Sequence, residues 1–117
     1  MKRSLFISVM IFLAIGVWSH SPSSFSIDYQ DNILTVESIH SVKNPGKHFI
    51  EKLTIHLNGE PVIVQEFKAQ SDSDKQQALY RIEGLAAEDK LKITAYCSIS
   101  GKRVIDWSIP QEDSDED

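Results

Sequence analysis

Two histidines frame a short loop near the middle of the chain. His40 follows a run of β-branched residues, His48 precedes an alternating run, and residues 41–47 between them contain a Pro-Gly pair. Loops held by a rigid sheet commonly carry binding groups. The single cysteine, Cys97, lies at the end of another alternating run. Imidazole nitrogen combined with thiolate sulfur favours iron, copper or zinc over magnesium or calcium, so these residues are candidate metal ligands.

Each candidate also has a purely structural interpretation. Cys97 shares the apolar face of its run with Ile93 and Ala95, and free cysteine is among the most buried residue types. A histidine at the start of a strand, as His48 is, is commonly a surface residue. His56 falls on the same predicted strand face as His48, but a rise of about 3.3 Å per residue separates them by about 26 Å. We therefore expect His56 to be an ordinary exposed strand residue.

The first residues have the layout of a secretory signal peptide. Lys2 and Arg3 precede the almost continuous apolar run Leu5–Trp18, which is a positive segment followed by an apolar one. The run is shorter than the roughly 20 residues of a transmembrane helix, although an uncleaved anchor is the alternative. Small residues favour cleavage after Ser19. Residues 1–19 are thus predicted to be a signal peptide, and the mature protein to be periplasmic or secreted, with no membrane attachment.

Composition limits the remaining chain to one small, nearly neutral domain. The whole sequence has 12 basic and 17 acidic residues, for a net charge of −5. Many of the acids lie in the tail, residues 111–117, which we expect to be solvated and disordered. No basic patch is present, so nucleic acid is excluded as a partner. One cysteine allows no internal disulfide, and residues 20–110 suffice for a single core.

That domain reads as a series of short strands. The expected strands are residues 25–29, 33–39, 47–57, 61–67, 78–82, 91–97 and 102–109. The Asp31-Asn32 and Asn58-Gly59 pairs favour tight turns. Residues 68–77 are expected to be loop, and residues 83–90 either loop or a single helical turn. About seven short strands without a convincing helix predict an all-β, immunoglobulin-like antiparallel β-sandwich.

Three short motifs resemble the iron domain of the superoxide reductases, the group that includes neelaredoxins and desulfoferrodoxins. His20-Ser21-Pro22 is similar to the family's H-x-P element. His40 through His48-Phe49-Ile50 resembles its pattern of histidine, proline-containing loop, histidine, aromatic residue and isoleucine. The segment Ala95–Gly101 looks like the family's C-x-x-H-G region. The resemblance extends over residues 20–101, most of the predicted domain.

The resemblance implies a mononuclear non-haem iron site on an immunoglobulin-like sandwich. Members of the family bind one iron through four histidines and one cysteine, and reduce superoxide to hydrogen peroxide without making oxygen. Carried over residue by residue, the expected metal ligands are His20, His40, His48 and Cys97. The expected substrate is superoxide or another small oxidant, and the expected partner is an electron-donor protein.

The sequence departs from the family pattern in three places. The loop between His40 and His48 is longer than usual, and Ser100 stands where the last histidine ligand belongs. The Glu-Lys pair that precedes the first histidine is missing, and its lysine helps to attract superoxide in the family. Lys43 and Lys47, in the loop between the two histidines, are candidate catalytic replacements. Their alternative role is that of solvated loop residues.

Signal cleavage offers one compensation for the missing ligand. If His20 becomes the N-terminus, its α-amine and imidazole can chelate a metal together, alongside His40, His48 and Cys97. An amine-plus-imidazole chelate favours Cu(II), so copper is the alternative metal. Three hypotheses follow: an iron protein of superoxide reductase type, a periplasmic copper-binding or metal-handling module that uses His20, and a metal-free interaction domain on the same fold.

Overall fold

The structure is a computed structural model that describes residues 21–111. Its strands are β1 (Ser24–Gln30), β2 (Ile33–Ile39), β3 (Ile50–Leu57), β4 (Glu60–Glu66), β5 (Lys75–Arg81), β6 (Leu91–Cys97) and β7 (Lys102–Trp107). Within this range there is no helix that could cross a membrane. The predicted signal peptide, the candidate ligand His20 and residues 112–117 of the predicted tail lie outside the described residues.

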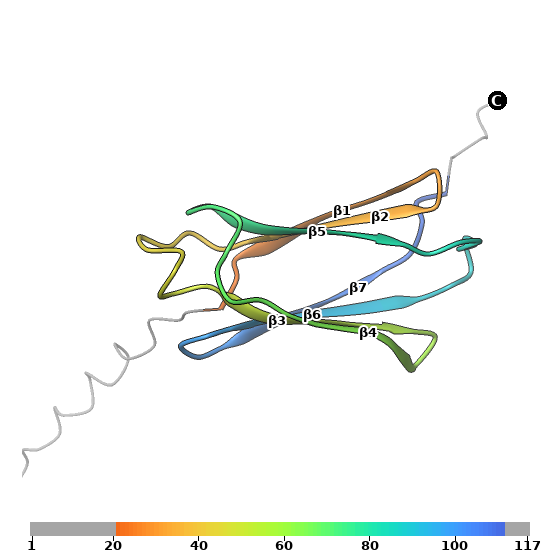
Figure 1. Cartoon of the computed structure of the whole chain (residues 1–117). Helices are drawn as coiled ribbons and strands as arrows, with labels where there is room; N and C mark the ends of the chain where they lie inside the picture. Colours follow the sequence, from red (N-terminus) through yellow and green to blue (C-terminus); the bar gives the residue numbers. More distant parts are fainter. Residues whose placement is uncertain (1–20, 112–117) are drawn as a thin grey trace, which may run out of the picture.

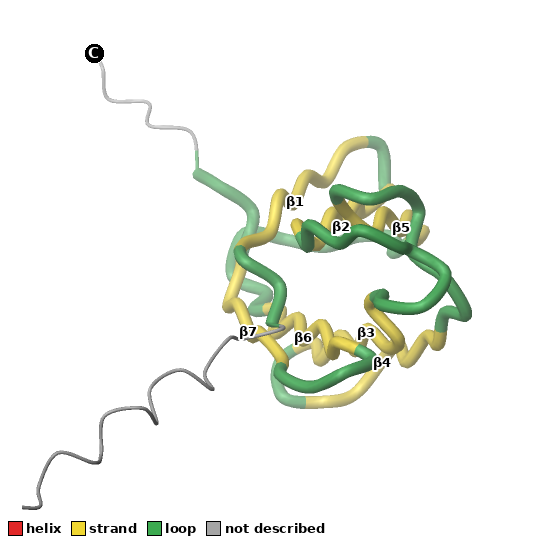
Figure 2. The backbone as a smooth tube through the Cα atoms, turned by 90° about the vertical axis from the view of Figure 1, so that its left-hand side faces the viewer, coloured by secondary structure: helices red, strands yellow, loops and turns green. Residues whose placement is uncertain are grey.

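The strands form two antiparallel sheets packed face to face (Figures 1 and 2). One sheet has the order β1-β2-β5, and the other has the order β4-β3-β6-β7. The first, second and fifth strands share one sheet and the third, sixth and seventh share the other, as strands A, B, E and C, F, G do in immunoglobulin domains. The predicted all-β sandwich of seven strands is confirmed.

The core forms from alternate residues of the central strands. Six buried residues form its central cluster: Leu34, Val36, Leu53, Ile55, Leu91 and Ile93. Side chains two apart on a strand face the same way, so β2 and β6 each contribute one inward row. Burying each of these side chains stabilises the fold by about 1.5–3 kcal/mol. Both rows continue beyond the apolar residues, so the side chains that follow at the same spacing also point into the interior.

Strand β3 departs from the predicted alternation at its start. The register between β3 and β6 shifts between Ile50 and Lys52, which is a β-bulge. Simple alternation placed Ile50 on the outer face with Lys52, but Ile50 is 0% exposed and Glu51 is exposed. A bulge inserts one extra residue and so reverses the facing of residues on either side of it. The strand also begins at Ile50 rather than residue 47, so His48 lies in the bend that precedes it.

Strand β5 begins earlier than predicted. Residues 75–77 were expected to be loop because they are polar, yet they pair with the last residues of β2. Polar side chains support this pairing: Lys75 Nζ lies 3.3 Å from Glu37 Oε2, and Gln77 Nε2 lies 2.9 Å from the same oxygen. The last strand, β7, is shorter than predicted, because it ends at Trp107 rather than at residue 109. Residues 83–90 form turns without a helix.

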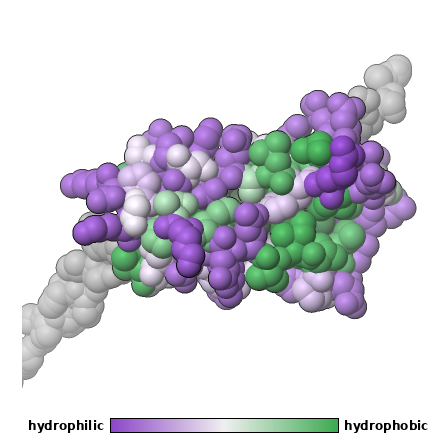
Figure 3. Space-filling view, viewed as in Figure 1, coloured by the Kyte–Doolittle hydropathy of each residue, from purple (hydrophilic) through white to green (hydrophobic). Residues whose placement is uncertain are grey.

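Apolar residues also reach the surface at the edge strands. Figure 3 shows apolar surface over β4 and β5, and the exposed large apolar residues of these strands are Val62, Val64 and Leu79. Both strands lie at sheet edges. Edge strands with unpaired backbone groups are places where proteins guard against unwanted pairing. Here charged residues, Glu60 and Glu66, begin and end β4.

Candidate metal centre

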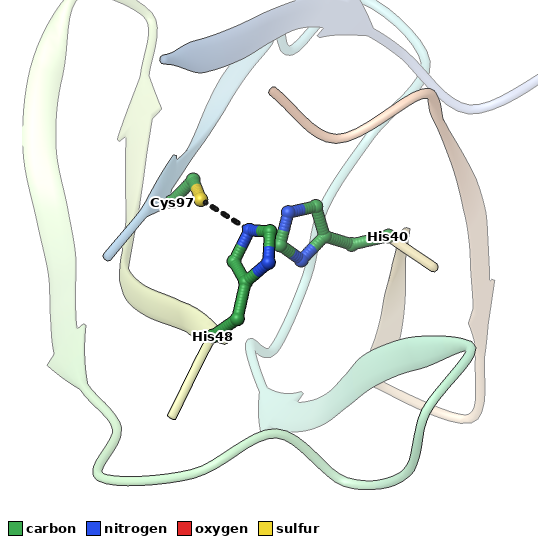
Figure 4. Close-up of side chains that lie close together, drawn as sticks. All are labelled: His40, His48 and Cys97. Carbon is green, nitrogen blue, oxygen red and sulfur yellow. Dashed lines mark hydrogen bonds between the residues drawn. The ribbon is translucent and has the colours of Figure 1, made fainter. Parts of the chain in front are cut away.

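His40, His48 and Cys97 come together between the two sheets at one end of the sandwich (Figure 4). One donor atom from each residue lies within 4.8 Å of the others. His48 Nε2 lies 3.2 Å from Cys97 Sγ. The two imidazole rings meet edge to face, with centroids 4.8 Å apart and planes at 86°. The structure thus joins both histidines that frame the loop with the only cysteine of the chain.

Two of the three residues extend the inward rows of the core. On β2 the inward positions Val36 and Ser38 lead to His40, which is 3% exposed. On β6 the inward position Ala95 leads to Cys97, which is 4% exposed. Strands β2 and β6 belong to opposite sheets and end at the same end of the sandwich. The period of two therefore directs an imidazole and a thiol toward each other across the interior.

The loop 41–47 places the third residue. The Asn44 carbonyl accepts hydrogen bonds from the backbone N–H groups of Lys47 and His48, both at 2.9 Å. The Asn44 side-chain oxygen accepts from Gly46 N at 3.0 Å, an interaction by which asparagine stabilises turns. Gln70 N donates to Pro45 O at 3.1 Å. These bonds close the loop on itself and fix the backbone from which His48 projects.

The turn after Cys97 is attached to the residue that follows His48. Ser98 N donates to Phe49 O at 2.8 Å, and Phe49 N donates to Ser98 Oγ at 3.1 Å. Ile99 N points its hydrogen at Cys97 Sγ over 3.4 Å. The same turn thus places a backbone hydrogen-bond donor directly beside the sulfur atom. The histidine and cysteine sides of the cluster are therefore held as one unit.

Gly101 brings the start of the described chain against this turn. Its φ is +95°, and a Cβ placed on it would lie 2.6 Å from Ser21 Oγ and 3.0 Å from Ser21 N. Both the backbone conformation and the close approach require glycine. Pro22 is fully buried and its carbonyl accepts from Arg103 Nε at 2.7 Å. His20 directly precedes this pinned segment, and its predicted role as a ligand stays a prediction.

A buried glutamine is hydrogen-bonded to the ring of His40. Gln70 is 6% exposed. Its Oε1 lies 2.8 Å from His40 Nδ1 and accepts from Ile50 N at 3.1 Å. Its Nε2 donates to His40 O at 2.8 Å and to Asp72 O at 2.9 Å. No pattern in the sequence indicated this residue, because it lies in a polar stretch predicted to be loop.

The geometry and the donor types fit one transition-metal ion. Ligand bonds of about 2.0–2.3 Å place two donors of the same ion at most about 4.0–4.6 Å apart. The His48 Nε2–Cys97 Sγ separation of 3.2 Å lies within this limit, and the spread of 4.8 Å among all three donors lies just outside it. Two imidazoles and a thiolate suit iron, copper or zinc. Within residues 21–111, the metal-ligand group contains neither aspartate nor glutamate, which removes the hard oxygen donors that calcium prefers.

The other predicted site residues lie around or away from this group. Lys43 and Lys47 are exposed on the loop, and their catalytic role stays a prediction. Ser100 is exposed in the turn after Cys97. His56 pairs with Lys92 on the far half of β3, away from the group as predicted. It is only partly exposed, however, because its Nδ1 is buried, which corrects the prediction of an ordinary exposed residue.

Comparison with solved structures shows which known fold the chain resembles. The chain is similar to "Superoxide reductase (1Fe-SOR) from Giardia intestinalis", with a TM-score of 0.57, 17% sequence identity, and coverage of 77% of this chain and 97% of that chain. For superoxide reductase from Nanoarchaeum equitans, the TM-score is 0.47 and the identity 21%, over 77% and 92%. The sequence matches no protein-family model and no curated protein. The likeness to the Giardia protein shows that the fold is superoxide-reductase-like.

Proposed function

We propose that this chain is a mononuclear iron protein of superoxide reductase type, which reduces superoxide to hydrogen peroxide. One observation carries the proposal: His40, His48 and Cys97 converge, largely buried, at one end of a superoxide-reductase-like sandwich. A fold alone does not fix a function. The donor group supplies the chemistry that the fold does not, because a cysteine and two histidines suit iron and copper, which are redox-active metals.

The chain's own residues would divide the work of such a site. The two imidazoles and the Cys97 thiolate would hold the iron, which when bound supplies the one-electron reduction of superoxide. Superoxide gains that electron and two protons from water to give hydrogen peroxide, and an electron-donor protein returns the electron. The Ile99 N–H group, 3.4 Å from the sulfur, would hold the thiolate in place. Exposed Lys43 and Lys47 would attract the anion.

The proposal includes export. The apolar run Leu5–Trp18, preceded by Lys2 and Arg3, supports a periplasmic or secreted location after cleavage at Ser19. In such a compartment unpaired thiols tend to be oxidised. A thiol that is 4% exposed and beside two histidines is protected by burial and would be protected further by a bound metal.

A copper protein is the second candidate, and the donor set itself favours it. Two histidines and one cysteine are the trigonal ligands of blue-copper electron-transfer sites. These are the residues that come together within the described part of the chain. In this version the protein stores or transfers copper without turnover, and the α-amine and imidazole of His20 complete the site.

Metal analysis of the protein exported from its host tests both candidates. The expected result is about one iron ion per chain, a visible thiolate-to-metal band, and superoxide consumption that yields hydrogen peroxide without oxygen. N-terminal sequencing of the same sample checks cleavage before His20. Copper in place of iron, with binding lost when one residue is added before His20, would select the second candidate.

Matched variants identify the site. Cys97→Ser and His48→Ala are expected to abolish the band, whereas His56→Ala, a histidine elsewhere on β3, is expected to keep it. If the wild type holds no metal and takes up neither Fe(II) nor Cu(I) under anaerobic conditions, both metal proposals fail. The metal-free interaction domain would then be the remaining hypothesis.

A further inference from the structure

The side-chain amide of Gln70 is fully engaged in hydrogen bonds. Three of its partners are backbone groups: the N–H of Ile50 faces Oε1 at 3.1 Å, and the carbonyls of His40 and Asp72 face Nε2 at 2.8 and 2.9 Å. The fourth partner is His40 Nδ1, 2.8 Å from Oε1. An amide has two donor hydrogens and one oxygen that accepts twice, so all four hydrogen-bonding positions of the Gln70 amide are used.

The three backbone partners determine which way the amide points. If the amide were turned over, Nε2 would face the Ile50 N–H group, and Oε1 would face two carbonyl oxygens. Each of these contacts would be repulsive in a buried site, where an unmade hydrogen bond costs about 1–3 kcal/mol. Oε1 therefore faces His40 Nδ1. Because Oε1 can only accept, Nδ1 must carry a hydrogen.

We infer that Gln70 is a positioning residue that holds His40 as its Nδ1–H tautomer and thereby presents the Nε2 lone pair to His48 and Cys97. A neutral imidazole with a hydrogen on one nitrogen has its lone pair on the other. The bond also fixes the ring, since Gln70 is anchored to the backbone at both sides of the cluster: at the end of β2 and the start of β3. This inference rests on the proposed metal-binding function of the same residues.

The choice of an amide has a consequence for the ligand. Metal-binding histidines usually donate their second N–H to a carboxylate, a backbone carbonyl or water, and the partner sets the basicity of the ligand. A neutral amide oxygen adds no negative charge to the site. Removing such a partner typically weakens metal binding by about 10–100-fold. We expect an effect of this size for Gln70, although it does not itself belong to the ligand group.

The chain contains a close control for this residue. Gln76 is also a buried glutamine, 5% exposed, and its amide is bonded to Ser71 N, Ser71 Oγ and Gln77 O at 2.9–3.1 Å. It organises the same segment as Gln70 but bonds to other groups. Replacing either glutamine with leucine removes a buried amide network of similar size. Only Gln70→Leu removes the partner of His40.

The first measurement uses metal-free, ¹⁵N-labelled protein at a pH of about 8.5, about two units above the pKa of an ordinary histidine. Long-range ¹H–¹⁵N correlation spectra identify the tautomer of each ring. The expected result is Nδ1–H for His40 in the wild type. An Nε2–H tautomer in the wild type would overturn the inference.

The second measurement is Co(II) titration, followed by thiolate absorption, with thermal unfolding recorded for each variant. Gln70→Leu is expected to bind about 10–100-fold more weakly than wild type, and Gln76→Leu to bind within about threefold of it. Equal losses in the two variants, or none in Gln70→Leu, would show that Gln70 acts only on stability and would overturn the inference. Should the leucine variant not fold, the tautomer spectra decide.

The two measurements separate the inference from the proposed function. A wild type that shows His40 as Nδ1–H but binds neither Co(II) nor Fe(II) would contradict the metal-binding proposal alone. A wild type that binds metal tightly with His40 ligated through Nδ1 would contradict the Gln70 inference alone.

Discussion

The two ends of the sandwich differ in where their polar side chains lie. At the end that lies away from the metal-ligand group, short turns and the 83–90 connection are closed by exposed polar side chains. At the end that carries the group, polar side chains enter the interior. In Figure 1 that end is on the left, where the loop 41–47 (yellow) and the turn after β6 (blue) lie.

The far end satisfies its backbone locally. The Asn58 side chain donates to Asp89 Oδ1 at 3.0 Å and accepts from Lys90 N at 2.8 Å, while Asp89 Oδ2 accepts from Ala86 N at 2.8 Å. Asn58 is exposed and Asp89 is partly exposed, so water can replace these bonds at little cost. Such an end connects strands, and among residues 21–111 it holds no group of three metal-ligating side chains.

The end with the candidate centre buries groups that are expensive to bury. His40 and Gln70 are 3% and 6% exposed, and Ser38 is 0% exposed with no hydrogen-bond partner for its hydroxyl within residues 21–111. An apolar residue at these inward positions would fill the interior without that penalty. The comparison teaches that stability of the sandwich alone does not explain this composition, whereas the proposed metal site would explain the buried His40 and Gln70.

The largest expected difference between the ends is in metal binding. Cys97→Ser removes the only thiolate, so affinity for Fe(II) or Cu(I) is expected to fall by more than about 100-fold. His56→Ala, in the far half of β3, is expected to leave affinity unchanged. Titration with an optical readout measures both. Comparable losses in the two variants would show that the ends do not differ in this way.

Two glycines with positive φ sharpen the comparison through stability. Gly101 has a φ of +95° with Ser21 against it, while Gly59 has a φ of +88° with no atom within 4 Å of an added Cβ. Gly59→Ala is expected to cost about 1 kcal/mol through its backbone conformation alone. Gly101→Ala is expected to cost about 2–3 kcal/mol, because the clash adds to the same strain.

Metal affinity distinguishes these two variants further. Displacing the Gly101 turn moves Cys97, whose N–H group donates to Gly101 O at 3.0 Å. We therefore expect weaker metal binding in Gly101→Ala and normal binding in Gly59→Ala. Urea unfolding and metal titration of the two proteins give the answer. If the glycine variants lose equal stability, Ser21 does not pack against the turn as described.

Local sequence patterns predicted the positions of the three residues that come together. The alternation of residues 91–97 correctly placed Cys97 on the inward face, in line with Ile93 and Ala95. The spacing of His40 and His48 around a Pro-Gly loop correctly marked two residues that come together. Period and spacing are local properties, so a single sequence reveals them.

The remaining features depend on partners far away in the chain. The inward position of Ile50 results from a bulge, which exists only when β3 pairs with β6. The early start of β5 follows from pairing with the end of β2, where Glu37 meets Lys75. Gln70 becomes buried because its loop folds over the site. Each is a property of the assembled sheets, which no period in the sequence encodes.

A smaller effect is expected from breaking the local network of the far end. Asn58→Ala removes the bonds to Asp89 and Lys90 and places alanine at a φ of 50°. The expected loss is about 1–2 kcal/mol in unfolding free energy, with metal affinity unchanged. Thermal unfolding with and without metal checks this. A matching drop in affinity would mean that the two ends are coupled through the sandwich.

The smallest expected effect is the contribution of Asp89 at acid pH. The hydrogen bond from the Ala86 backbone, and then the one from the Asn58 side chain, lower the pKa of Asp89 below its ordinary value of 3.8. A carboxylate with a lowered pKa in the folded state adds stability above pH 3.8 that is lost as the pH falls through the folded-state pKa. Comparing wild type with Asp89→Asn should therefore show a difference in melting temperature at pH 5–7 that shrinks toward pH 2–3. A difference that stays constant over this range would mean that the charge of Asp89 does not contribute, and that the far end is held by hydrogen-bond geometry alone.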